Sequence, residues 1–199
     1  MARNIFIDCG THYGEGLRQV AQRLGIDASW EVHCFEPNPE CSWYFAKERI
    51  LEGPSVHFHA TAVWICDGTV GLRQENHALS QTESPVFGGS PIDGWGSTIM
   101  ADSVHPALQE PIGVPCVDLS RFIRENTREG DRVVVKLDVE GAEYAILRKM
   151  IEERSLDLVQ EMYVEFHSRF LPSESAESTE RLKDEIRQAF PRLRFLEWE

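Results

Sequence analysis

Acidic residues and one histidine follow four apolar segments of the chain, at the points where strands would end. Asp8 closes the apolar segment 4–9, Glu36 follows a second, Asp138 follows a third, and His167 ends a fourth. In an open parallel sheet, ligands bind just outside the carboxyl ends of the strands. We therefore expect these four side chains to line one binding or catalytic site.

The loop after the first of these segments is rich in glycine. Gly10 permits a tight turn, and Gly14 lets a ligand approach the start of the next helix. The spacing differs from G-x-G-x-x-G, the pattern that holds the pyrophosphate of a dinucleotide. Glu36, at the end of the second strand, can accept both hydroxyl protons of a ribose. Together, the glycine loop and Glu36 favour a nucleoside cofactor without phosphates. This indicates S-adenosylmethionine rather than NAD. The alternatives are ordinary turn chemistry and, for Glu36, a helix-terminal carboxylate beside Asn38.

Strands and helices alternate along the chain and would position these residues. The best example is the segment 133–150, in which three valines form a buried strand and an apolar-periodic helix follows Gly141. Asn38 is expected to cap a helix that has Pro39 at its first position. Further strands are expected at 4–10, 31–37, 55–64, 115–118, 157–167 and 193–198, with a hairpin at Asp67-Gly68. This alternation predicts a doubly wound α/β fold with a mostly parallel sheet, in one domain over residues 1–199.

Residues 76–115 differ in character, with five prolines, five glycines and no sustained periodicity. A loop of this length inside a compact domain is usually a lid or a binding loop. We therefore expect this segment to be a lid or a substrate loop, and a solvent-exposed insertion is the alternative.

Composition narrows the class of protein and of partner. The 199 residues carry a net charge of −13, which argues against a nucleic-acid partner because such binding rests on Lys and Arg. The five cysteines are widely spaced without a C-x-x-C pair, so we expect reduced thiols. No signal peptide and no apolar run of the roughly 20 residues that a membrane span needs is seen, so a soluble, cytoplasmic protein is expected.

The order of motifs resembles the FkbM family of S-adenosylmethionine-dependent methyltransferases. The matching segments are FIDCGTHYGEG (6–16), CFEPNP (34–39), ATAVWICDGTVGL (60–72), GSTIM (96–100), VDLSRFI (117–123), VVKLDVEGAEYAIL (134–147) and VEFH (164–167). The resemblance implies a Rossmann-like class I methyltransferase fold. It also implies methyl transfer to a hydroxyl of a sugar, glycan or natural product. N-methylation of a peptide or small molecule, and a non-catalytic cofactor-binding module, are the alternatives.

The resemblance also assigns roles to residues. Asp8, Gly10 and Gly14 would hold the methionine part of the cofactor, Glu36 the ribose, and Asp138 the region of the transferred methyl group. The full set of implied cofactor contacts is Asp8, Gly10, Thr11, His12, Gly14, Glu36, Pro37, Asn38, Thr61, Ala62, Val63, Ser97 and Asp138; the segment Thr61-Ala62-Val63 would lie near the adenine. The chain differs from many relatives in having His12 and in ending with one clear strand instead of an antiparallel pair.

Methylation of an aliphatic hydroxyl also needs a proton acceptor. His167 is the first candidate, since the unperturbed pKa of histidine, about 6.5, suits a base at neutral pH. Glu165 is placed to orient its imidazole. Glu140 and Glu143 are rivals, although for Glu143 we favour a helix-terminal charge.

Two further roles concern the neighbours of these groups. Lys136 shares a strand face with Asp138 and is interpreted as an electrostatic partner of the carboxylates. The predicted site residues include no metal ligands, but Asp138, Glu140, Glu165 and His167 leave a metal-dependent variant open.

Overall fold

The structure is a computed structural model of the chain, and it describes residues 2–47, 50–75 and 96–198. Its elements, in chain order, are β1 (Asn4–Cys9), α1 (Glu15–Leu24), β2 (Trp30–Phe35), α2 (Pro39–Lys47), β3 (Ser55–His59), β4 (Ala62–Trp64), β5 (Gly68–Leu72), β6 (Ile112–Asp118), α4 (Leu119–Asn126), β7 (Arg132–Leu137), α5 (Glu143–Glu152), η2 (Ser155–Leu158), β8 (Glu161–Val164), η3 (Ser168–Phe170), α6 (Ala176–Ala189) and β9 (Arg194–Glu197). The predicted alternation of strands and helices is therefore present.

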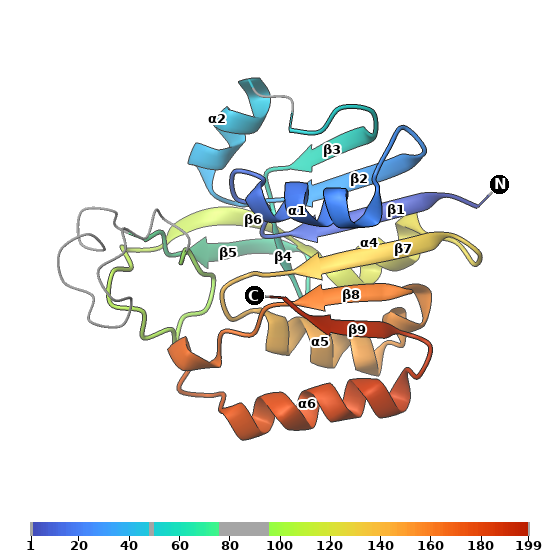
Figure 1. The fold of residues 1–199 in the computed structure, drawn as a ribbon. Coiled ribbons are helices and arrows are strands. Elements are labelled where there is room, and N and C mark those ends of the chain that lie inside the picture. Colours follow the sequence, from blue (N-terminus) through green and yellow to red (C-terminus); the bar gives the residue numbers. More distant parts are fainter. Residues whose placement is uncertain (1, 48–49, 76–95, 199) are drawn as a thin grey trace.

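Six strands form one sheet in the order β3-β2-β1-β7-β8-β9, and every neighbouring pair in it is parallel (Figure 1). The chain starts in the middle at β1, winds outward to β3, and later resumes at β7 on the other side of β1. This is the doubly wound α/β fold that the sequence predicts. Its switch point lies between β1 and β7, where a ligand site is expected.

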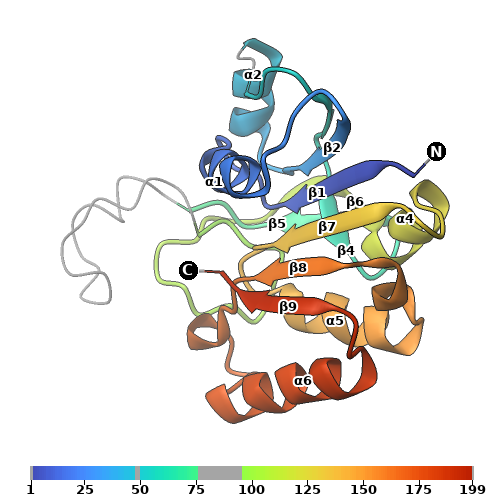
Figure 2. The ribbon, with the colours of Figure 1, turned by 45° about the vertical axis from the view of Figure 1, so that its right-hand side comes forward.

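Helices cover both faces of this sheet, as the two views in Figures 1 and 2 show. On one face, α1 packs Leu17 and Val20 against Phe6 and Val134. On the other face, α4, α5 and α6 pack apolar residues over the inner strands. The central strands are buried on both faces, which explains why Val133, Val134 and Val135 form a continuous apolar run.

A smaller sheet has the order β4-β6-β5, with β6 parallel to β4 and antiparallel to β5. Two predictions are therefore wrong. The segment 55–64 is two strands in two sheets, separated at Thr61. The turn at Asp67 makes no hairpin, because β6 lies between β4 and β5. Instead, the Asp67 carboxylate accepts the N–H of Asp118 at 3.0 Å and thereby fixes the start of α4.

The C-terminal strands also differ from the expected pattern. The predicted strand 157–167 is shorter, since η2 occupies its beginning and β8 covers only Glu161–Val164. The closing strand β9 is present and runs parallel to β8. In the described part of the chain, the main sheet thus has six strands and no antiparallel pair.

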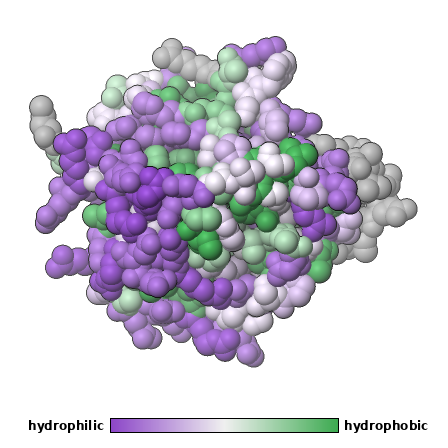
Figure 3. Space-filling view, turned by 180° about the vertical axis from the view of Figure 1, so that it is seen from behind, coloured by the Kyte–Doolittle hydropathy of each residue, from purple (hydrophilic) through white to green (hydrophobic). Residues whose placement is uncertain are grey.

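Three remaining expectations concern surface and chemistry. Residues 76–95 of the expected lid lie outside the described residues, and residues 112–115 belong to β6. All five cysteines are free thiols, as predicted, and Cys66 alone is exposed. No helix in the described ranges is long and apolar enough to cross a membrane. Hydrophilic residues cover most of the face in Figure 3, with apolar residues between them in small groups.

Candidate active site at the carboxyl edge of the sheet

The carboxyl ends of β1, β2, β7 and β8 meet at one edge of the sheet, because neighbouring strands are parallel and in register. This topology brings Asp8, Glu36, Asp138 and His167 to the same edge. Asp8 lies directly opposite Lys136 in the register of β1 and β7. The residues that the sequence predicts at four separate strand ends are therefore assembled in one region.

The turn after β1 depends on Gly10. Gly10 has φ +79°, and a Cβ built there would lie 1.7 Å from the carbonyl oxygen of Asp138. The N–H groups of Gly10 and Thr11 both donate to the carbonyl of Phe35, at 3.0 and 3.1 Å. The loop after β1 is thus held against the ends of both neighbouring strands, and only glycine allows this approach.

The beginning of α1 is shaped by two more glycines. Gly14 has φ +87°, directly before the helix, and a Cβ there would lie 2.8 Å from a methyl group of Ile50. Gly16, in the first turn, leaves room for Lys136, because a Cβ would lie 2.7 Å from the lysine Cε. The need for glycine at position 16 could not be predicted from the sequence, because Lys136 lies 120 positions away in the chain.

Glu36 joins the loops that follow β1 and β2. Its Oε2 accepts the N–H of His12 at 2.9 Å, and its Oε1 accepts the N–H of Asn38 at 2.8 Å. Burial raises the pKa of Glu36 to about 7. Each carboxylate oxygen has two acceptor directions, so each retains one for a further donor such as a hydroxyl. Asn38 caps α2 as predicted, since its Oδ1 accepts the N–H of Glu40 at 3.0 Å.

Lys136 is a buried ammonium between the two inner strands. Its Nζ lies 2.8 Å from Oδ2 of Asp138 and 3.7 Å from Oδ1 of Asp8. Burial lowers the pKa of Lys136, but the charges of Asp138 and Asp8 outweigh this effect and raise it. Asp8 is fully buried, and its carboxylate oxygens form no hydrogen bond among the described residues. The geometry agrees with the interpretation of Lys136 as the partner of these carboxylates.

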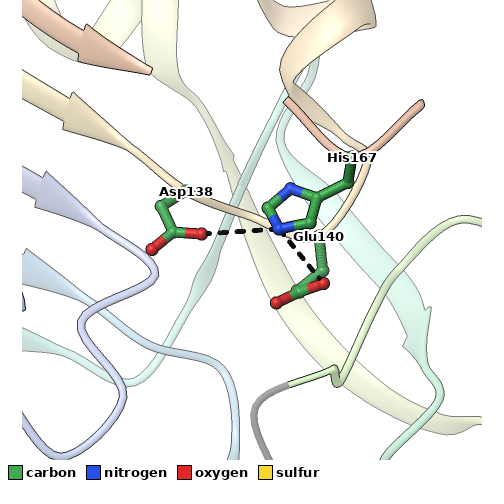
Figure 4. A group of neighbouring side chains, drawn as sticks. All are labelled: Asp138, Glu140 and His167. Atoms are coloured by element: carbon green, nitrogen blue, oxygen red, sulfur yellow. Dashed lines mark ion pairs between the residues drawn. The ribbon is translucent and has the colours of Figure 1, made fainter. Parts of the chain in front are cut away.

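Four carboxyl side chains lie near the imidazole of His167, and Figure 4 shows two of them, Asp138 and Glu140, beside one ring nitrogen. The Nε2 atom lies 3.4 Å from Glu165, 3.5 Å from Glu140 and 3.9 Å from Asp138. The Nδ1 atom lies 3.0 Å from Oε1 of Glu143. Burial lowers the pKa of His167, but the charges of Glu143 and Glu140 prevail and raise it well above the ordinary value. The unperturbed pKa that favoured His167 as a base therefore does not apply in the fold.

Glu143 stands at the start of α5, as expected for a helix-terminal charge, and it also contacts the imidazole of His167. Glu143 is fully buried and also accepts the N–H groups of Val139 and Gly141, both at 2.9 Å. It fixes the turn between β7 and α5 and contacts the ring through Nδ1. Glu165, which was expected to orient the imidazole, lies 3.4 Å from the other ring nitrogen, and that role stays a prediction. The only local signal for this role is a carboxylate two residues after a glycine turn.

Glu140 occupies a constrained position in that turn. Its φ is +54°, in the left-handed region, and its carbonyl accepts the hydroxyl of Thr98 at 2.6 Å. Burial raises the pKa of Glu140 to about 8. This hydrogen bond connects the segment that begins at residue 96 to the turn that carries Glu140. Ser97, the neighbour of Thr98 and the predicted cofactor contact, accepts the N–H of Glu75 at 3.3 Å, and its predicted role stays untested.

The segment Thr61-Ala62-Val63 follows β3 at the same edge as Glu36. The N–H of Glu36 donates to the carbonyl of His59, at 3.1 Å, and so does the N–H of Thr61, at 2.8 Å. Val63 is buried in the same core as Phe35. The predicted adenine segment and the predicted ribose residue are therefore neighbours, and their roles stay predictions.

Comparison with known proteins gives a family. The crystal structure of Methyltransferase FkbM from Methylobacillus flagellatus KT aligns with 78% of this chain and 30% of its own length, at 12% identity and a TM-score of 0.41. This chain therefore spans less than a third of that protein. No protein with a curated description matches the chain. The family model described as the Methyltransferase FkbM domain matches residues 8–196. Because this match covers nearly the whole sequence, the chain belongs to the FkbM family of methyltransferases.

Proposed function

We propose that the chain transfers a methyl group from S-adenosylmethionine to a hydroxyl of a sugar, glycan or natural product. The supporting observation is the edge itself: a glycine turn and a buried carboxyl group, Glu36, beside a cluster of acidic side chains. Six carboxylates gather there against the charged groups of Lys136 and His167, namely Asp8, Glu36, Asp138, Glu140, Glu143 and Glu165. S-adenosylmethionine carries a sulfonium and an ammonium, which such an edge would attract.

The proposed placement follows the order of the strands. Glu36, with Pro37 and Asn38 beside it, takes the ribose hydroxyls at the end of β2. Asp8, Gly10 and Gly14, with Thr11 and His12, take the methionine part at the end of β1, Thr61-Ala62-Val63 borders the adenine, and Ser97 completes the set. Asp138, at the end of β7, faces the methyl group. The adjacency of β2, β1 and β7 supports this order.

Methyl transfer is an in-line displacement on the sulfonium, in which placement of the two reactants can supply about 7–11 kcal/mol. The acceptor hydroxyl must also lose a proton. The side chain of His167 is 3% exposed, whereas those of Glu140 and Asp138 are 18% and 22% exposed. An acceptor hydroxyl that arrives from solvent therefore meets Glu140 and Asp138 before His167. We assign Glu140 as the group that accepts the hydroxyl proton, with Asp138 next to it and His167 buried beneath both.

Titration calorimetry with S-adenosylmethionine and its demethylated product tests the cofactor. Wild type should bind both. Glu36→Gln keeps the shape but replaces one hydroxyl-accepting oxygen with a donor, so it should weaken binding about tenfold, the effect of about 1.4 kcal/mol. Glu129→Gln removes the same charge from an exposed loop outside this edge and should bind as wild type does.

Absence of binding to the wild type would reject the proposal. The acceptor is tested separately, with labelled methyl donor and parallel panels of hydroxylated and amine-bearing small molecules. Fragment mass spectrometry then locates the methyl group, and transfer to amines alone would reject O-methylation.

A further inference from the structure

The Nε2 atom of His167 is a buried ring nitrogen that faces three carboxyl side chains, those of Glu140, Asp138 and Glu165. On the other side of the ring, Nδ1 lies 3.0 Å from Oε1 of Glu143, which accepts a hydrogen from it when ionised. His167 is nearly completely buried, so bulk water does not solvate Nε2.

The distances around Nε2 are longer than those of good hydrogen bonds. At 3.4, 3.5 and 3.9 Å, the three carboxylate oxygens lie beyond the range of about 2.7–3.2 Å of a good N–H···O bond. Lys136 binds the other oxygen of Asp138, Oδ2, and therefore neutralises that carboxylate from the far side.

The same distances suit ligands around one metal ion. The ligand atoms of Asp138, Glu140 and His167 all lie within 4.8 Å of one another. Hard cations bind oxygen at about 2.0–2.6 Å, so two ligands of one ion are separated by up to about twice that length. Metal-binding histidines commonly donate their other N–H to a carboxylate, and Glu143 supplies that contact here.

From this geometry we infer a divalent-cation site formed by Asp138 Oδ1, Glu140 Oε2 and His167 Nε2, with Glu165 beside it. Carboxylate oxygens with a single imidazole and no thiolate favour ions of the Mn²⁺ and Mg²⁺ class. The three residues come from the end of β7, the following turn and the end of β8, and they converge in Figure 4. If the proposed methyl transfer is correct, an acceptor hydroxyl on this ion would be held in place and would lose its proton more readily. Oε1 of Glu140 would remain to receive that proton.

Manganese binding to the full chain tests the inference without any activity measurement. After treatment with a chelator, wild type is titrated with Mn²⁺, and electron paramagnetic resonance reports the ion that stays free. We expect one bound equivalent, which excess Mg²⁺ displaces. Glu140→Gln and His167→Asn should each weaken binding about tenfold or more, while Glu129→Gln should bind as wild type does. Circular dichroism checks that each variant is folded.

Two results would overturn the site: no loss of the free-ion signal with wild type, or equal binding by wild type and both ligand variants. Calorimetry with S-adenosylmethionine separates this outcome from the proposed function. A chain that binds Mn²⁺ but no cofactor retains the metal site and loses the methyltransferase proposal. A chain that binds the cofactor but no Mn²⁺ loses the metal site and retains the methyltransferase proposal.

Discussion

The two halves of the carboxyl edge are built in different ways. At the ends of β1 and β2, main-chain groups define the shape: Gly10 contacts Asp138 through the backbone, and both oxygens of Glu36 accept backbone N–H groups. At the ends of β7 and β8, side chains define it, since four carboxylates surround one imidazole, His167. The first half fixes a shape, and the second concentrates charge.

This difference indicates what each half needs from its ligand. The backbone contacts at the ends of β1 and β2 fix the positions of the two loops, and in the proposed function Glu36 would accept the ribose hydroxyls between them. A cluster with more carboxylates than cations is complete only when a positive group enters, either a proton, a metal ion or the sulfonium of the proposed cofactor. Lys136 joins the halves, because its ammonium lies between Asp8 of β1 and Asp138 after β7.

Removal of the Lys136 ammonium should have the largest effect on the stability of the fold. Lys136→Met keeps most of the side-chain volume but leaves Asp8 and Asp138 without their shared cation. Loss of one partner of a buried ion pair costs about 3–5 kcal/mol, so chemical denaturation should show a fall of this size in the free energy of unfolding. The double variant Lys136→Met/Asp8→Asn, which removes one of the two charges, should recover part of the loss. A single variant as stable as wild type would show that the halves are not joined electrostatically.

A glycine substitution probes the backbone-defined half alone. Gly10→Ala should cost about 3 kcal/mol, of which about 1–2 comes from the positive φ and the remainder from the contact with the Asp138 carbonyl. Gly25→Ala is the matched control, because Gly25 has φ +64° but nothing lies within 4 Å of its Cβ position. The difference between the two unfolding free energies isolates the contact. Equal losses would mean that the loop after β1 yields to the new methyl group.

How much of this arrangement the sequence predicts depends on how local each cause is. The strand at Val133–Val135 and the Asn38 cap with Pro39 follow from neighbouring residues, and both are present. The order β4-β6-β5 was missed because Asp67 binds the N–H of Asp118, 51 positions away, and no turn signal records such a contact.

The role of Glu143 was missed for the same reason. A carboxylate at the first position of a helix ordinarily serves the helix terminus, and its contact with His167 lies 24 positions away. The strand ends themselves were predictable because parallel strands bring their carboxyl ends together whatever their separation in the chain. Their side-chain partners required the packed structure.

The two halves also differ in how they shift the pKa of their histidines. Beside β2, the ring of His59 stacks on Phe35, and its Nε2 lies 3.1 Å from Nδ1 of His33. Burial lowers the pKa of His59 to about 4, with further lowering by the charges of His33 and His57. His167, in the other half, has its pKa raised. The surroundings therefore lower the pKa of His59 in one half and raise the pKa of His167 in the other.

Acidification should destabilise the half that contains His59. The folded pKa of His59 lies below the unfolded value of about 6.5, so the unfolded chain binds the proton first. This contribution is present in full above about pH 6.5 and is lost as the pH falls toward 4. Partial exposure to solvent reduces the expected loss between pH 7 and pH 5 to about 1 kcal/mol, the smallest effect considered.

Denaturation midpoints at pH 7 and pH 5 measure this loss by comparison of wild type with His59→Gln. The variant cannot titrate at this position, so its stability should fall less over that interval than the stability of wild type. His57→Gln removes a ring that is about half exposed and should keep most of the wild-type fall. Because carboxylates such as Glu36 titrate in all three proteins, only the difference between them reports the imidazole. An equal fall in all three would show that His59 is not kept neutral by its neighbours, and the contrast between the two halves would then rest on the carboxylates alone.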